Sequence, residues 1–222
     1  MNDRSQGGTS RTDGELELMV HRRLLHDDDF GVGEALNETG VSGKGLVVRG
    51  RHILLVGPKA TAARDHRLLG VELLLQPVTT FIVNDNLPET VFRKYFNTEV
   101  AGLTAELPAN VHLMTVEQWK GEEDRLLLRL EHIFQKGEDV ELSKPATVHL
   151  RNLFTRFEVM EARELTLSAN ADVTALKDRL VFDYTPIGNV STPVTEPVKG
   201  DKLTVTLHPM QIRTFEVVVR RL

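Results

Sequence analysis

Apolar and polar residues alternate along several short stretches of this chain, and that period predicts β-strands. Near the start, Leu16, Leu18 and Val20 alternate with two glutamates, which is typical of a half-buried strand. Continuing the alternation places Arg22 on the apolar side and Arg23 on the polar side. An arginine that points inward must meet an acid or a carbonyl, because an unpaired buried guanidinium is very costly.

Three aspartates at 27–29 and two spaced glycines, Gly31 and Gly33, follow the arginines. This composition predicts a turn that presents its side chains. One interpretation is a strand with a salt-bridged arginine pair, closed by a solvated acidic turn. The other is a strand end that delivers arginines to a polyol or an anion. A calcium loop is disfavoured, because the spacing of acids in an EF-hand is missing.

The rest of the first half predicts strands and one helix. The runs 46–48 and 53–56 indicate a hairpin or two adjoining strands. The period changes afterwards and predicts a helix near 60–75, ended by Pro77. The β-branched and aromatic residues of 78–83 then predict another strand.

The second half has a regular series of short strand-like runs separated by Gly, Pro and acidic turns, which predicts a β-sandwich. The predicted strands are 111–119, 125–134, 147–150, 157–163, 181–184, 203–207 and 213–219. The segment 84–108 carries Pro88, Gly102 and Pro108 and is interpreted as the crossing between two domains. The sequence therefore predicts one domain over 1–107 and a second over 108–222.

Composition narrows the function classes. The 222 residues are 41% hydrophobic, enough for a real core, and the net charge of -5 gives no reason to expect a nucleic-acid partner. No apolar run approaches the length of a membrane span, and no signal peptide follows Met1. The absence of cysteine removes disulfides and thiolate chemistry.

Few other residues suggest chemistry. The eight histidines include no pair at the spacing of a helical zinc site, so no metal ligand is predicted. His132 and His149 are expected to be hydrogen-bonded structural residues, and Trp119 and Phe134 to pack in the core or between domains. Two sequons predict glycosylation at Asn37 and Asn189, each beside a turn-forming glycine.

Five segments together resemble one known family, in the same order and from end to end. They are NDRSQGGTS, DGELELMVHRRLLHDDDFGVGEAL, GRHILLV, LLLRLEHIF and HPMQIRTFEV, at 2–10, 13–36, 50–56, 126–134 and 208–217. They are similar to the C-terminal part of a family-38 glycoside hydrolase. The resemblance implies a mainly β fold, in which the end of a galactose-mutarotase-like supersandwich is followed by an immunoglobulin-like sandwich.

The resemblance also implies a function. Family members are retaining, zinc-dependent α-mannosidases that hydrolyse terminal α-D-mannose residues in N-glycan and oligomannoside catabolism, and the relatives most similar to this chain are lysosomal. Their nucleophile and zinc ligands lie in an N-terminal catalytic domain to which nothing here corresponds. The chain alone is therefore expected to be inactive and without a cofactor. Its expected partners are that catalytic domain and a mannose-containing oligosaccharide, with a homo-oligomer left open.

The same resemblance gives the arginine pair a role. In the family, the His-Arg-Arg-Leu stretch lies against the catalytic domain and contributes an arginine near the substrate. His21 stands here where Golgi relatives carry an acid. Arg22 and Arg23 are therefore the substrate-pocket candidates. Strand parity favours Arg22, whereas a bulge before the acidic turn would select Arg23.

Two other function classes stay open. One is a stand-alone carbohydrate-binding or protein-interaction module without hydrolase activity, which mannose binding by the isolated chain would favour. The other is an independent hydrolase, which needs two carboxylates across a sugar. The acids at 27–29 are available, but nothing identifies a nucleophile among them.

Overall fold

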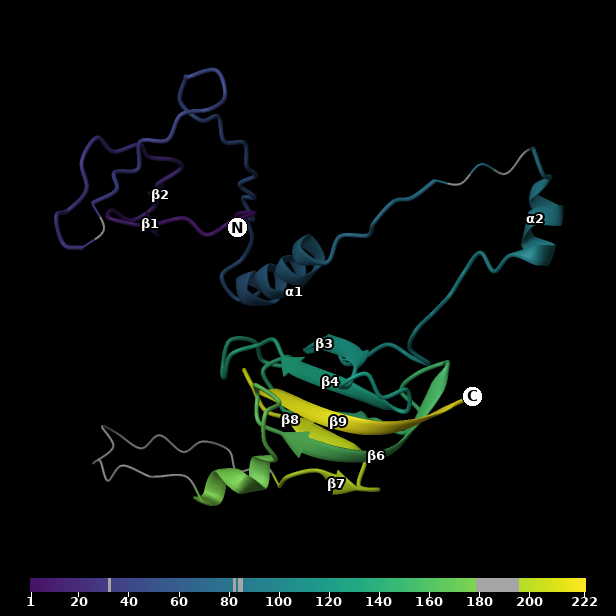
Figure 1. The fold of residues 1–222 in the computed structure, drawn as a ribbon. Coiled ribbons are helices and arrows are strands. Elements are labelled where there is room, and N and C mark those ends of the chain that lie inside the picture. The colour runs from purple at the N-terminus through teal and green to yellow at the C-terminus, as the bar shows by residue number, and fades with distance from the viewer. Residues whose placement is uncertain (32, 82, 84–85, 179–195) are drawn as a thin grey trace. The chain divides into compact units, whose positions relative to one another are not determined.

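The computed structural model describes residues 1–31, 33–81, 83, 86–178 and 196–222 (Figure 1). Contacts group the chain into two compact units, Met1–Gly57 and Pro58–Leu222. The sequence predicts a domain boundary between 107 and 108, which assigns 58–107 to the first domain rather than the second. That boundary stays a prediction. No helix within the described ranges has the length and apolar character to cross a membrane.

The second unit contains a β-sandwich (Figure 1). Its larger sheet is antiparallel and has the order β3-β4-β9-β6-β7. Its smaller sheet pairs β5 with β8, also antiparallel. The strands are β3 (Val111–Gln118), β4 (Arg125–His132), β5 (Ala146–His149), β6 (Phe157–Leu165), β7 (Lys199–Gly200), β8 (Thr204–Leu207) and β9 (Ile212–Arg221).

The strand alternation seen in the sequence builds the sandwich core. Leu128 of β4 lies opposite Phe215 of β9, and both are fully buried. Val205 of β8 is also fully buried, whereas Thr204 beside it is exposed. Alternate residues of a strand point to opposite faces, so each strand contributes one row of side chains to the core. The predicted strands therefore match the observed ones, except that 181–184 lies outside the described residues and β7 was missed.

Charged residues connect three strands of the larger sheet. Glu216 of β9 lies directly across from Arg163 of β6, and its carboxylate accepts hydrogen bonds from Arg163 and from Arg125 of β4. Burial alone raises the pKa of Glu216, but the hydrogen bonds and charges of the two arginines outweigh it and lower the pKa. The carboxylate is therefore held ionised, as a structural tie between β4, β9 and β6.

The first unit, Met1–Gly57, contains far less regular structure. Its strands are β1 (Gly8–Thr9) and β2 (Glu17–Leu18), which pair antiparallel. The strands predicted at 46–48 and 53–56 are wrong, because the structure has no strand in either run. A strand needs a hydrogen-bonded neighbour, and two-stranded pieces are at best marginally stable alone.

Helices lie in the segment that precedes the sandwich. Helix α1 spans Ala62–Leu74, within the segment where the sequence predicts one, and helix α2 (Glu89–Tyr95) was not predicted. The strand predicted over 78–83 is wrong, because its described residues have no strand partner. A short 3-10 helix, η1, covers Val173–Asp178.

Two ion pairs join α1 to the sandwich. Arg64 donates from Nε to Asp139 at 2.9 Å, and Arg67 donates from Nη2 to Glu138 at 3.1 Å. The two arginines lie three positions apart, so they share one face of the helix. No residue of α1 is fully buried, so these charged contacts are a substantial part of what fixes the helix against the sandwich.

The ion pair of Asp139 predicts how helix docking responds to acid. The hydrogen bond from Arg64 and those from two backbone N–H groups hold the pKa of Asp139 well below its ordinary value of 3.8. Because the native pKa is lower than the unfolded one, the contribution is complete above about pH 4 and is lost only as pH falls towards the native value. We expect hydrogen exchange of α1, corrected for the intrinsic rate, to show the same protection at about pH 7 and pH 5.

Matched variants test this contact. Asp139→Asn removes the charge but keeps an acceptor for the backbone N–H groups of Glu141 and Leu142. It is expected to speed exchange over Ala62–Leu74 at both pH values, whereas Glu141→Gln, which changes an exposed carboxylate, is expected to leave that exchange unchanged. Equal protection of α1 in both variants would contradict the claim that the ion pair with Asp139 holds the helix.

Candidate functional site

The arginine pair lies in the first unit, beyond the end of β2. Regular pairing ends at Leu18, and both Arg22 and Arg23 are exposed in irregular backbone. The parity argument that favoured Arg22 therefore does not apply, because no strand extends that far. Leu16 and Val20 are also exposed, at 68% and 60%, so the predicted half-buried strand is observed only over two residues.

The structure brings Arg23 together with the sequon residue Asn37. The Nε group of Arg23 donates to Oδ1 of Asn37 at 2.7 Å, and the N–H of Leu24 donates to the carbonyl of Leu36 at 2.9 Å. Within the described part of the chain, the Arg22 side chain forms no hydrogen bond or ion pair. Asn37 is exposed, as its turn predicts, whereas Asn189 lies outside the described residues.

The acidic segment after the arginines forms a bend. The carboxylate of Asp28 accepts a hydrogen bond from the N–H of Phe30 at 3.2 Å, and Asp29 has a positive φ of 57°. Asparagine and aspartate tolerate this backbone region better than most residues. Within the described ranges, no three His, Cys, Asp or Glu side chains are grouped closely enough to hold a metal ion.

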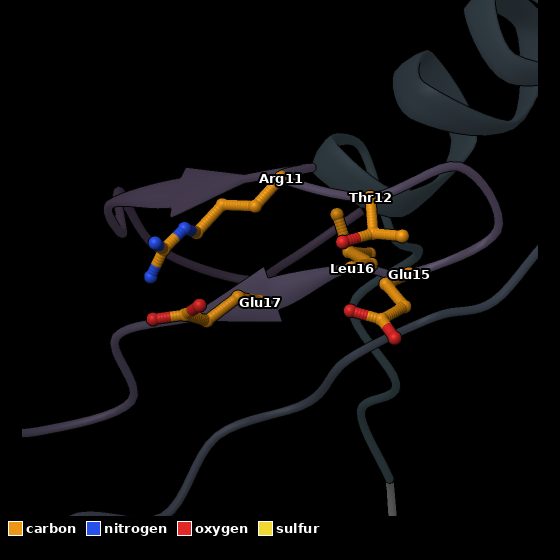
Figure 2. Close-up of a pocket in the computed structure, with 5 residues that line it drawn as sticks. All are labelled: Arg11, Thr12, Glu15, Leu16 and Glu17. Atoms are coloured by element: carbon orange, nitrogen blue, oxygen red, sulfur yellow. The ribbon is translucent and has the colours of Figure 1, made fainter.

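A small polar hollow, which the sequence did not indicate, lies on the β1–β2 hairpin. It encloses about 310 Å³ and is lined by Arg11, Thr12, Glu15, Leu16 and Glu17. Figure 2 shows the guanidinium of Arg11 extending towards the carboxylate of Glu17, with Glu15 on the other side of Leu16. All five lining residues are exposed. The hollow contains neither Arg22 nor Arg23.

The histidines in strands have structural partners. His132 is fully buried, its Nε2 donates to the carbonyl of Lys144 at 2.9 Å, and its Nδ1 accepts the N–H of Phe134 at 3.3 Å. Both ring nitrogens are therefore occupied. His149 shares a hydrogen bond of 3.1 Å with the hydroxyl of Thr204 on the neighbouring strand.

The two aromatic residues considered in the sequence pack against apolar neighbours. Phe134 is fully buried. Trp119 packs on a small cluster of Leu127, Leu165 and Ala169, and the ammonium of Lys120 lies 4.8 Å from the centroid of a Trp119 ring. Both positions agree with packing roles rather than with an open sugar-stacking platform.

Comparison with known proteins identifies the sandwich. Residues 110–215 match the family described as "Glycosyl hydrolases family 38 C-terminal beta sandwich domain". The match covers strands β3 to β8 and part of β9. The chain therefore carries a C-terminal β-sandwich domain of glycoside hydrolase family 38.

The similarity extends beyond the sandwich to nearly the whole chain. Over 97% of its length, the chain is 46% identical to lysosomal alpha-mannosidase of Bos taurus and 45% identical to that of Felis catus. It is 35% identical to an alpha-mannosidase of Canavalia ensiformis over 96% of its length. The chain spans only about a fifth of these relatives, from 20% to 22%. It thus corresponds to the C-terminal region of family-38 lysosomal α-mannosidases.

Proposed function

We propose that this chain is the non-catalytic C-terminal part of a lysosomal-type α-mannosidase and that it scaffolds the catalytic domain. The complete enzyme hydrolyses terminal α-D-mannose residues of N-glycans and oligomannosides, using a zinc ion and a nucleophile from its N-terminal domain. The names and identities of the relatives support this proposal. The single structural observation that carries the scaffolding role is the exposed apolar surface of Met1–Gly57.

The described residues of Met1–Gly57 lack the buried apolar core that the second unit has. Every buried hydrophobic residue in the described part of the chain lies at or after Val111. In Met1–Gly57, fourteen described large hydrophobic side chains are exposed instead, including Phe30 at 92% and Val47 at 87%. Soluble monomers rarely leave so much apolar surface uncovered, and such surfaces mark interaction sites.

The energetic consequence is large. Full burial of one such side chain contributes about 1.5–3 kcal/mol, so covering half of the fourteen would contribute on the order of 10 kcal/mol before association costs. That is comparable to the total stability of a domain. We infer that Met1–Gly57 packs its exposed apolar side chains against the rest of the enzyme. In this proposal 1–107 belongs to the supersandwich and 108–222 is the immunoglobulin-like sandwich.

Hydrogen exchange tests the scaffolding role. In the isolated chain, amides of Met1–Gly57 are expected to exchange rapidly while those of β4 and β9 stay protected. In the longer enzyme that contains this chain, the amides of Met1–Gly57 are expected to become protected as well. The same fast exchange over Met1–Gly57 in both samples would contradict packing against the catalytic part, and β4 and β9 are the internal control for folding.

We further propose that the arginine pair reaches the substrate pocket of the complete enzyme. A guanidinium offers several donors in a fixed fork and suits sugar hydroxyls or a catalytic carboxylate. In the full-length enzyme, Arg22→Lys and Arg23→Lys are therefore made separately, with folding checked by thermal melting. Loss of a charge-assisted hydrogen bond in the transition state should lower kcat/KM by roughly tenfold to a hundredfold, or about 1.5–3 kcal/mol. Unchanged kinetics in both variants would contradict the substrate-pocket role and favour a structural role for the two arginines.

A further inference from the structure

The hydrogen bond between Arg23 and Asn37 distinguishes the two neighbouring arginines. Arg23 donates from Nε to Asn37 Oδ1 at 2.7 Å, next to the backbone bond from Leu24 to Leu36 at 2.9 Å. The backbone bond holds the two segments side by side, so the side-chain bond joins neighbours that are already aligned. Arg22 has no comparable contact within the described residues.

The bond uses only one edge of the guanidinium. Because the group is planar, a hydrogen bond from Nε restricts the directions in which the two Nη groups can point. Neither Nη group of Arg23 donates a hydrogen bond to the described residues. A β-carbon built at Gly45 would lie 3.5 Å from Nη1, an ordinary contact distance, so backbone flanks that side. An arginine held by Nε with free Nη groups is preorganised to bind a hydroxyl pair or a carboxylate.

We propose that Asn37 is a positioning residue that orients Arg23 for the substrate pocket of the complete enzyme. This inference rests on the arginine role proposed above and assigns it to Arg23 rather than Arg22. It also gives Asn37 a second role beside that of glycan acceptor. An N-linked glycan is bonded to Nδ2 of asparagine, which leaves Oδ1 able to accept from Arg23, so the two roles are compatible.

Three variants of the full-length enzyme separate the hydrogen bond from the glycan. Asn37→Ala removes both, whereas Thr39→Ala destroys the sequon and leaves the Asn37 amide in place. Asn37→Asp also removes the glycan but keeps an oxygen that accepts from Arg23, now with charge assistance. Each variant is checked by thermal melting and by glycopeptide mass spectrometry before kinetics with an aryl α-mannoside.

A positioning role predicts a specific pattern. Asn37→Ala is expected to lower kcat/KM by about tenfold relative to Thr39→Ala, because a misplaced group loses most of its transition-state contact. Asn37→Asp is expected to stay within about threefold of Thr39→Ala. In an Arg23→Ala background, replacing Asn37 by alanine is expected to have no further effect, since the residue acts only through Arg23.

The outcomes distinguish this inference from the function on which it rests. If Arg23→Ala lowers kcat/KM while Asn37→Ala behaves as Thr39→Ala does, the arginine role stands and the positioning role of Asn37 is overturned. If Asn37→Asp lowers kcat/KM as much as Asn37→Ala does, loss of the hydrogen bond does not explain the impairment and the inference is overturned. If Arg23→Ala has no effect on kinetics, the role proposed for Arg23 itself fails.

Discussion

Replacing Glu164 by alanine is expected to destabilise the sandwich by about 3–5 kcal/mol, because the buried charge of Arg213 would lose its carboxylate partner. The side chains of Glu164 and Arg213 are only 9% and 3% exposed. Nε of Arg213 donates to one carboxylate oxygen of Glu164 at 2.8 Å, and Nη2 donates to the other oxygen. The pair is therefore bidentate and largely removed from solvent, the setting in which loss of one partner is most costly.

The pair also connects parts of the sandwich that are distant in sequence. Arg213 on β9 donates to the carbonyl of Thr206 on β8, so it crosses from the larger sheet to the smaller one. It donates as well to the carbonyl of Glu196, at 3.0 Å. Glu164 on β6 accepts the N–H of Val198 at 3.0 Å. Removing the carboxylate would leave the guanidinium without its counter-charge and this backbone donor without its side-chain acceptor.

Urea unfolding followed by fluorescence measures the effect. Trp119 is the single tryptophan and packs on the sandwich, so its emission reports unfolding of this unit. The control is Glu141→Ala, because Glu141 pairs with Lys144 on the surface, with side chains 66% and 61% exposed. That change is expected to cost about 0–1 kcal/mol. A Glu164→Ala midpoint no lower than that of Glu141→Ala would contradict the assignment of a structural ion pair.

The sandwich was predictable from sequence because its own residues complete it. Leu128 and Leu130 alternate with Arg129, and Leu203 and Val205 alternate with Thr204. Each run finds its partner strands within the chain, so the period observed in sequence becomes the burial observed in structure. The pairing of Glu164 with Arg213 was not predictable, because residues 49 positions apart carry no local signal of their contact.

The first unit was predicted less well for a physical reason. The runs at 46–48 and 53–56 have strand composition, but strands form only when a neighbour supplies hydrogen bonds and covers the apolar face. The exposed Val47 and Leu54, at 87% and 83%, show that these residues lack such a neighbour here. The contact of Arg23 with Asn37 likewise depends on how the turn between them folds, which periodicity does not specify.

The second large expected effect concerns the mannosidase activity of the isolated chain. The relatives are about five times as long as this chain. We propose that the nucleophile and the zinc ligands lie in the part of the enzyme that this chain does not include. Enzymes accelerate such reactions by many orders of magnitude, about 10⁶-fold or more. The isolated chain is therefore expected to hydrolyse an aryl α-mannoside no faster than buffer, with or without added zinc. The N-terminal remainder, lacking its scaffold, is expected to be unstable and poorly active.

Coexpression of this chain with the N-terminal remainder of the enzyme tests the central claim most directly. The two polypeptides are expected to copurify and to show zinc-dependent mannosidase activity that neither shows alone. A variant with Val47 and Leu54 changed to aspartate is the matched control, expected to abolish copurification while the sandwich still unfolds at the wild-type urea concentration. Failure of the two polypeptides to associate, with mannose binding by the chain alone, would contradict the account in favour of a stand-alone module. Turnover by the chain alone, abolished by a substitution at one of its own acids, would contradict it in favour of an independent hydrolase.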